Sequence, residues 1–160
     1  MAKGPERVRR ALVERGIDVA IRRVDESTRT AAEAAEALGV YVGQIAKSLV
    51  FRGEASGDAL LVIASGDRRV SESLLADLAG EPIGRADAAF VREHTGFAIG
   101  GVAPLGHPEP LRCWIDEDLT RFDTVWAAAG SPFAVFPVAP SALPAMTGGE
   151  LARLAGGESA

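Results

Sequence analysis

The order of segments along this 160-residue chain predicts an α/β fold with one mixed, mainly antiparallel central sheet and helices packed around it. Segments with strand character outnumber helical ones, and several consecutive strands are joined by loops of the hairpin type. Apolar residues make up 48% of the chain, which is enough for one proper core. Because no Gly-x-Gly-x-x-Gly or Gly-x-x-x-x-Gly-Lys-Ser/Thr sequence follows a strand, a doubly wound nucleotide-binding fold is not expected.

Helices are indicated by apolar positions at helical spacing, bounded by capping residues and a closing glycine. Thr30 and Glu33 have the spacing of a capping box, and Ser71 can cap a later helix. The expected helices cover residues 5–15, 30–38, 71–78, 86–94 and a short segment from Ser141, with a helical turn at 117–122.

Strands are expected at residues 17–24, 45–52, 59–65, 97–99, 111–115, 124–129 and 133–138. The first of these alternates apolar and polar residues, as a half-buried strand does. The loop at 53–58 and the turn at 130–132 each join two strands and predict two hairpins. We expect a single domain over residues 1–154, followed by a flexible tail at 155–160.

The formal charge of −5 argues against indiscriminate binding of nucleic acids, but the charge is uneven along the chain. Residues 1–30 hold eight basic and five acidic residues, a net +3, which leaves −8 for the remainder. The basic segment is either a local contact for a polyanion or the solvated face of a first helix. No apolar stretch reaches the length of a membrane span and no signal peptide is evident, so a cytoplasmic protein is expected.

Lys47 is the residue that most needs an explanation. Fifteen of the seventeen basic residues are arginines, and Lys47 is one of only two lysines. Strand alternation places it on one face with Ile45, Leu49 and Phe51, the face that should be buried. An ammonium there must be paired, neutral or facing a cavity, unless it protects an edge strand or extends to water. Lysine, unlike arginine, offers a compact charge that can lose its proton.

The segment from Gly100 to Pro108 is the second informative feature. Adjacent glycines at 100 and 101 let the backbone approach a ligand, and their N–H groups can hold a carboxylate, a phosphate or an oxyanion. The structural alternative is a turn that requires positive φ. Pro104 and Gly106 then restrict the exit from this turn.

The other reactive side chains give weaker signals. Cys113 lies in an apolar strand, so a buried structural thiol is expected. His94 and His107 share no metal-binding spacing, and His107 remains a candidate for lining a pocket. The acids at 116–118 are explained by helix capping. No metal or cofactor is expected, and no serine has the setting of a hydrolase nucleophile.

Three motifs in order resemble the YbaK/EbsC/ProX family, the free-standing relatives of the editing domain in bacterial prolyl-tRNA synthetase. They are the threonine-containing loop at residues 27–31, the lysine strand at 44–51 and the segment 95–107 with its glycine loop. The resemblance covers residues 5–154. It implies a partly barrel-like sheet with a pocket between sheet and loops, which agrees with the strand pattern.

The resemblance implies hydrolysis of the ester between a wrong amino acid and the 3′-terminal ribose of a tRNA. The invariant lysine of the family falls on Lys47 as a catalytic residue, with Gly100 and Gly101 in the glycine loop. The expected substrate-binding residues are Thr28, with Thr30 as a second candidate, and Pro104, Gly106 and His107. Candidate tRNA contacts in the basic segment are Arg7, Arg10, Arg22 and Arg29.

In the mechanism expected from these residues, Lys47 is a positioning cation, and glycine N–H groups hold the carbonyl oxygen. Water attacks, and a ribose hydroxyl relays the proton. The implied cargoes are cysteine, alanine, serine and threonine, and the implied partners are aminoacyl-tRNA and a synthetase such as prolyl-tRNA synthetase. The chain is expected to be a monomer or homodimer without membrane contact. A non-catalytic module that binds a small amino acid or a tRNA 3′ end is the alternative, and a general small-ester hydrolase would need a protein nucleophile.

Overall fold

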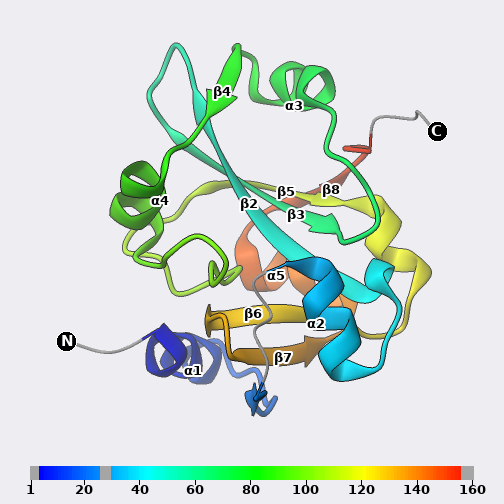
Figure 1. The fold of residues 1–160 in the computed structure, drawn as a ribbon. Coiled ribbons are helices and arrows are strands. Elements are labelled where there is room, and N and C mark those ends of the chain that lie inside the picture. The colour runs from blue at the N-terminus through cyan, green and yellow to red at the C-terminus, as the bar shows by residue number, and fades with distance from the viewer. Residues whose placement is uncertain (1–3, 26–29, 156–160) are drawn as a thin grey trace.

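The computed structural model describes residues 4–25 and 30–155, which form helices around an eight-stranded mixed sheet (Figure 1). The strand order is β1-β7-β6-β2-β3-β5-β8, and β4 pairs with β2 outside this path. The strands are β1 (Arg22–Arg23), β2 (Ile45–Gly53), β3 (Ala59–Ser65), β4 (Ile83–Arg85), β5 (Arg112–Asp116), β6 (Val125–Ser131), β7 (Ala134–Val138) and β8 (Glu150–Ala152). The helices are α1 (Gly4–Glu14), α2 (Ala31–Leu38), α3 (Glu72–Ala79), α4 (Ala88–Thr95) and α5 (Leu143–Thr147), with 3₁₀ turns η1 (Val42–Gln44), η2 (Glu117–Arg121) and η3 (Pro140–Ala142).

The predicted mixed sheet is confirmed. Four strand pairings are antiparallel (β1–β7, β2–β3, β2–β4 and β6–β7), and three are parallel (β2–β6, β3–β5 and β5–β8). Strands β1 and β8 are the two ends of the order and do not pair with each other within the described residues. The sheet is therefore open, and the barrel-like closure is not completed by strand pairing.

Two expected strands differ in the structure. In the segment 17–24 only Arg22–Arg23 forms a strand, although Ile17, Val19 and Ile21 pack against the core as their alternation predicted. The segment 97–99 forms no strand and enters a turn instead. Strands β4 and β8 were not predicted, because three residues are too few to show a period. Of the expected tail at 155–160, only residue 155 is described, and residues 156–160 lie outside the described part of the chain.

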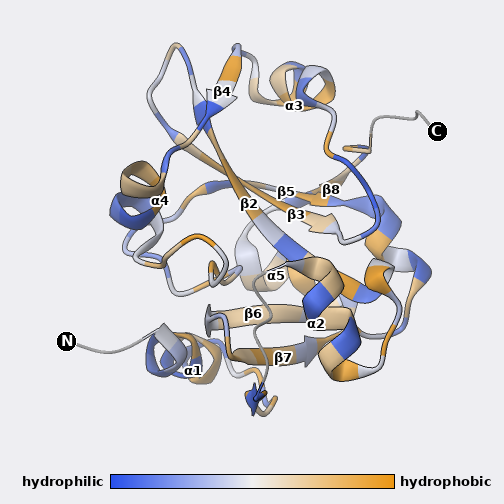
Figure 2. Ribbon diagram, in the orientation of Figure 1, coloured by the Kyte–Doolittle hydropathy of each residue, from blue (hydrophilic) through white to orange (hydrophobic). Residues whose placement is uncertain are grey.

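The core has one layer on each face of the sheet. Strand β3 is buried along its whole length: Leu61 and Ile63 face the larger cluster with α1 and residues 97–105, while Leu60, Val62 and Ala64 face a second cluster with α3. Helix α2 covers Ile45 at the start of β2. Figure 2 shows hydrophobic and hydrophilic stretches alternating along α1 and α2, as expected for helices that cover a core on one side.

A gap in the sheet next to β2 positions the site. Strand β2 pairs with β6 only at Ile45 and Ala46, and with β4 only from Phe51 to Gly53. Between these positions its edge has no strand partner among the described residues. The Gly53 N–H donates to the Asp58 carbonyl across the hairpin at 2.9 Å. Backbone groups alternate between the two edges of a strand, so Gly53 and every second residue before it hydrogen-bond to β3. Ser48 belongs to the other set, and its backbone N–H and C=O therefore face the gap.

Candidate active site

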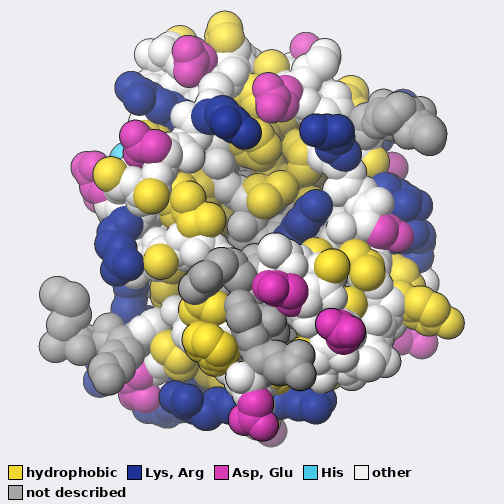
Figure 3. Space-filling view, viewed as in Figure 1, with side chains coloured by type: hydrophobic (Ala, Val, Ile, Leu, Met, Phe, Trp, Pro, Cys, Tyr) yellow, Lys and Arg dark blue, Asp and Glu magenta, His cyan; other side chains and the backbone are white. Residues whose placement is uncertain are grey.

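The gap beside β2 opens into a cavity of about 790 Å³. Its lining comes from β2, the start of α2, the segment 85–91, the turn at Gly100 and strands β6 and β7. Most of these side chains are apolar, among them Ala34, Val102 and Ala128. On this face Figure 3 shows hydrophobic side chains gathered between β4 and β2, with Lys and Arg side chains around them. The volume suits a small organic ligand with a few polar contacts.

Lys47 lines this cavity and is half-buried. It lies opposite Ala64 of β3, on the sheet face of Leu49 and Phe51 that strand alternation predicted. Its strand is interior to the sheet order, so protection of an outer edge does not explain it. Within the described residues the ammonium forms no hydrogen bond and no ion pair closer than 4.0 Å. Burial lowers the pKa of Lys47 below its ordinary value, while the charges of Asp67 and Asp116 oppose this.

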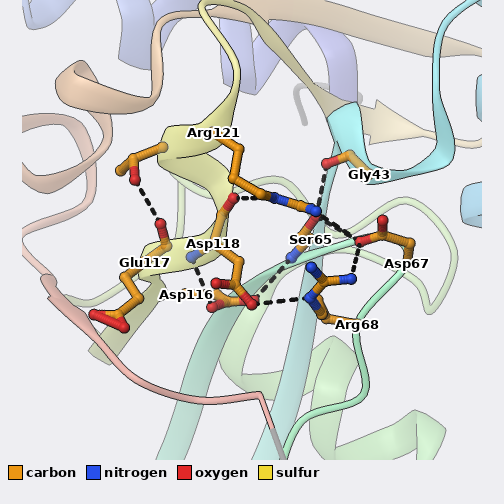
Figure 4. Close-up of polar contacts among 9 residues, drawn as sticks. Gly43, Ser65, Asp67, Arg68, Asp116, Glu117, Asp118 and Arg121 are labelled. Atoms are coloured by element: carbon orange, nitrogen blue, oxygen red, sulfur yellow. Dashed lines mark hydrogen bonds and ion pairs between the residues drawn. The ribbon is translucent and has the colours of Figure 1, made fainter. Parts of the chain in front are cut away.

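A network of charged side chains lies at the ends of β3 and β5 (Figure 4), and two of its members, Asp67 and Asp116, act on Lys47 through their charge. The Ser65 hydroxyl donates to the Gly43 carbonyl at 2.7 Å, and the Arg121 guanidinium donates to Asp67 at 3.0 Å. Asp116 is 1% exposed and accepts the Asp118 N–H at 3.0 Å, which confirms the expected capping role. Desolvation raises the pKa of the Asp116 carboxyl.

This network was not foreseen as part of the site. Ala64 lies opposite Lys47, and the β3–β5 register brings Asp116 level with Ala64 on the following strand. The negative charge therefore lies on the lysine side of the sheet without touching the ammonium. The proximity of Asp116 to Lys47 depends on the register of the β2–β3 and β3–β5 pairings. The sequence alone does not reveal these pairings.

Ser48 adds polar groups to the cavity wall. Its hydroxyl oxygen is buried and has no hydrogen-bond partner in the described structure. Its backbone N–H and C=O face the unpaired strand edge. Since a buried polar group without a partner costs about 1–3 kcal/mol, these groups favour a polar ligand over an empty apolar cavity.

The two adjacent glycines have different roles. Gly100 lines the cavity at φ +94°, a conformation that a side chain disfavours. The Gly101 N–H donates to the Ala98 carbonyl at 3.0 Å and closes the turn. A Cβ on Gly101 would lie 3.0 Å from the backbone of Ser131, so the close approach of the β6–β7 hairpin favours glycine at this position. The expectation of two free N–H donors therefore does not hold for Gly101, whereas the Gly100 N–H donates no hydrogen bond to any described residue.

Pro104, Gly106 and His107 shape the loop and are not among the described residues that line the cavity. Pro104 is buried, and the Gly106 carbonyl accepts a hydrogen bond from Arg7. A ring nitrogen of His107 lies 2.8 Å from the Ala103 carbonyl, and the ring meets the edge of Phe97. Burial lowers the pKa of His107. These contacts hold the loop behind the turn at Gly100, and the expected substrate contacts of the three residues stay a prediction.

The predicted residues in the threonine loop are only partly described. Thr28 and Arg29 lie outside the described residues. Thr30 accepts the Glu33 N–H at 3.1 Å, and Glu33 accepts the Thr30 N–H at 3.3 Å, so the predicted capping box is confirmed. Thr30 also lines the cavity, at the N-terminus of α2.

Three of the four arginines expected to contact tRNA lie within the described residues, and their tRNA contacts stay a prediction. The Arg7 guanidinium donates to the carbonyls of Gly96 and Gly106, and Arg10 pairs with Glu6 at 3.5 Å. Arg22 is exposed, with its guanidinium 5.9 Å from the Trp126 ring centre. Two arginines that were not singled out, at positions 52 and 85, line the cavity.

The remaining expectations concern cysteine, metals and membranes. Cys113 is buried, and desolvation raises the pKa of its thiol to about 11, so the structural interpretation is confirmed. Within residues 4–25 and 30–155, no group of three or more His, Cys, Asp or Glu side chains could hold a metal ion. No helix in that part of the chain is long and apolar enough to cross a membrane.

Comparison with known proteins gives consistent matches. The family model described as "Aminoacyl-tRNA editing domain" matches residues 25–145. The uncharacterized protein YwhH of Bacillus subtilis is 37% identical over 120 residues, covering 74% of this chain and 75% of its own. The protein named "Putative Cys-tRNA(Pro)/Cys-tRNA(Cys) deacylase EbsC" of Enterococcus faecalis is 26% identical over 130 residues, covering 81% and 79% of the two chains.

A crystal structure described as that of "a putative trans-editing enzyme for prolyl tRNA synthetase" is similar to this chain with a TM-score of 0.90 and 46% identity, covering 98% of this chain and 99% of its own. The hypothetical protein APE2540 has a similar structure with a TM-score of 0.86 and 32% identity, covering 93% and 99% of the two chains.

Proposed function

Because the chain belongs to the YbaK/ProX-like family of aminoacyl-tRNA editing domains, we propose that it hydrolyses the ester bond of mischarged tRNA carrying a small amino acid. The proposed cargoes are cysteine, alanine, serine and threonine, and the proposed mode is editing in trans. The observation that carries the proposal is the ammonium of Lys47, which lines an apolar cavity and has no hydrogen-bond or ion-pair partner among residues 4–25 and 30–155.

In the proposed reaction, Lys47 attracts the ester carbonyl or a neighbouring phosphate and offsets the negative charge that develops on the carbonyl oxygen. The Gly100 N–H is the second donor for this oxygen, since Gly101 uses its own N–H within the turn. Water forms a bond to the acyl carbon, the bond to the ribose oxygen breaks, and that oxygen takes a proton relayed by the neighbouring ribose hydroxyl. The products are the free amino acid and uncharged tRNA.

Small amino acids are proposed because synthetase pockets discriminate one methylene by only about 1–3 kcal/mol and leave such errors to a second site. The cavity walls at Ala34, Val102 and Ala128 are apolar, and Ser48 adds a hydroxyl that has no hydrogen-bond partner in the described part of the chain. This combination suits a short side chain next to a polar ester.

The test is a panel of tRNAs mischarged with the four amino acids, assayed for deacylation by the wild-type chain and by Lys47→Ala. Loss of one oxyanion-stabilising donor costs about 100-fold or more, so Lys47→Ala should be at least that much slower. Lys47→Arg should keep tRNA affinity yet lose most activity, because the planar guanidinium cannot replace a compact ammonium.

A wild-type chain that binds these tRNAs but hydrolyses none of them would overturn the proposal. That result would support the alternative, a module that binds a small amino acid or a tRNA 3′ end together with a synthetase.

A further inference from the structure

Two arginines lie at the mouth of the cavity on the ribbon formed by β2 and β4. Arg52 pairs with Gly84 and Phe51 pairs with Arg85, so the two arginines occupy neighbouring positions on adjacent strands. Since side chains alternate between faces, they point to opposite sides of the ribbon. Both are exposed and both line the cavity. The ribbon therefore presents one exposed cation on each of its faces, and both contribute to the cavity lining.

The charges of these two arginines are not neutralised by the described residues around them. Neither forms an ion pair within 4.0 Å or a hydrogen bond, and the Arg52 guanidinium lies 5.6 Å from the centre of the Phe90 ring. Two acids, Glu72 and Asp87, also line the cavity but pair with neither arginine, and Asp87 is engaged in capping α4 at 2.8 Å. A guanidinium on an aromatic face keeps its donors directed outward.

The basic segment at the N-terminus contrasts with this entrance. Arg9 and Arg10 both pair with Glu6, and Arg7 is engaged with loop carbonyls. The arginines at positions 7, 9 and 10 of α1 therefore already have partners within the protein, and no nucleic acid is needed to account for them. Arg52 and Arg85 have no comparable contacts with the residues that the structure describes.

We propose that Arg52 and Arg85 bind the backbone phosphates of the single-stranded 3′ end of tRNA as it enters the cavity. This inference rests on the proposed function. An ester that reaches Lys47 is attached to the terminal ribose, and the phosphate of that nucleotide is only a few bonds away. The phosphates must therefore cross the entrance, where arginine can bind their oxygens with two parallel hydrogen bonds.

The experiment compares the double variant Arg52→Gln/Arg85→Gln with the matched control Arg69→Gln/Arg153→Gln, which removes the same charge from two exposed positions outside the cavity lining. Deacylation of mischarged tRNA is measured from low to high salt. Loss of two phosphate contacts should reduce kcat/KM about 10- to 100-fold at low salt and reduce the slope of its logarithm against log salt by about 1.4. The control should stay close to the wild type in both respects.

A second substrate, 3′-O-aminoacyl-adenosine, carries the ester but no phosphate. The entrance variant should hydrolyse it as fast as the wild type does. An equal loss on both substrates would overturn the inference, because the arginines would then serve the shape of the cavity. An effect confined to the control variant would also overturn it.

Binding of a short single-stranded oligoribonucleotide ending in CCA, measured by fluorescence anisotropy, separates this inference from the proposed function. If the wild type hydrolyses nothing but the entrance variant alone binds the oligonucleotide at least tenfold more weakly, the proposed function fails and the phosphate site stands. Equal binding by the wild type and the entrance variant would overturn the phosphate site.

Discussion

At the scale of the residue, Lys47 occupies a half-buried position that an apolar side chain would fill without the free-energy cost of desolvating an ammonium. Its ammonium is half-buried and lacks a direct partner among the described residues, while Asp67 and Asp116 act on it only through their charge. Strand alternation was sufficient to predict its face. The pairing of Gly101 with Ala98 was not predictable, because it depends on how the loop packs against Ser131. Local periodicity carries information about faces but not about contacts across the fold.

Replacement of Lys47 by methionine should make the protein more stable and inactive. Because burial lowers its pKa, the charged form is disfavoured in the folded state, so at pH 7 the folded chain bears a desolvation penalty. We expect Lys47→Met to raise the free energy of unfolding by about 0.5–1 kcal/mol at pH 7. The gain should shrink as the pH rises from the lowered folded pKa toward the ordinary 10.5, where the wild-type lysine is neutral in both states. Urea denaturation at pH 7 and pH 10 measures this. A variant less stable than the wild type at pH 7 would show that Asp67 and Asp116 fully compensate the charge.

At the scale of the element, the long strands and capped helices were predicted because each carries its own signal. The hairpin β2–β3, the capping box at Thr30 and the helix capped by Ser71 all match the expected segments. Strand β4 carries no such signal: it has three residues and forms only by pairing with β2. Arg85 was missed for the same reason, since its place at the cavity follows from that long-range pairing.

The loop at 53–58 supplies a prediction about pH. The Glu81 carboxylate accepts hydrogen bonds from the Ser56 N–H at 2.8 Å, the Ala55 N–H at 3.0 Å and Arg112 at 2.7 Å. These contacts, with Ser56 contributing most, lower the pKa of Glu81 from 4.5 to about 2. A lowered carboxyl pKa stabilises the fold above the unfolded pKa, and this contribution is lost as the pH falls through the folded pKa. Glu81→Gln should therefore be less stable than the wild type above pH 4.5, and the difference should vanish toward pH 2.

The measurement is the free energy of unfolding from pH 2.5 to pH 7, with Glu93→Gln on the exposed face of α4 as the control. The control should follow the wild type throughout. A difference in the free energy of unfolding between Glu81→Gln and the wild type that does not depend on pH would contradict this prediction. It would show that the charge of the carboxylate does not stabilise the loop.

At the scale of the whole molecule, the glycine loop is fixed from two directions. The β6–β7 hairpin contacts Gly101 on one side, and α1 reaches the same loop through Arg7 on the other. The charge pattern of the sequence indicated a basic N-terminal segment but could not show which of its arginines would be used inside the fold. Arg7 contacts residues about 90 to 100 positions away, and no local pattern carries that information.

A basic residue in α1 can either support the glycine loop or contact tRNA, and variants of Arg7 distinguish these two roles. The Arg7 guanidinium donates to the Gly96 carbonyl at 3.0 Å and to the Gly106 carbonyl at 2.6 Å, and it lies 4.8 Å from the centre of the Phe97 ring. Arg7→Met keeps the aliphatic packing but leaves both carbonyls without the donor, so stability should fall by about 2 kcal/mol. Because the loop then loses its support, kcat should fall while the salt dependence of tRNA binding stays that of the wild type. Arg7→Lys keeps the charge but lacks the planar guanidinium that donates to both carbonyls. Its stability and kcat should therefore resemble those of the methionine variant. Urea denaturation and deacylation across a salt series test both. If Arg7→Met weakened tRNA binding without loss of stability, and Arg7→Lys restored it, Arg7 would instead be a contact for the acceptor stem.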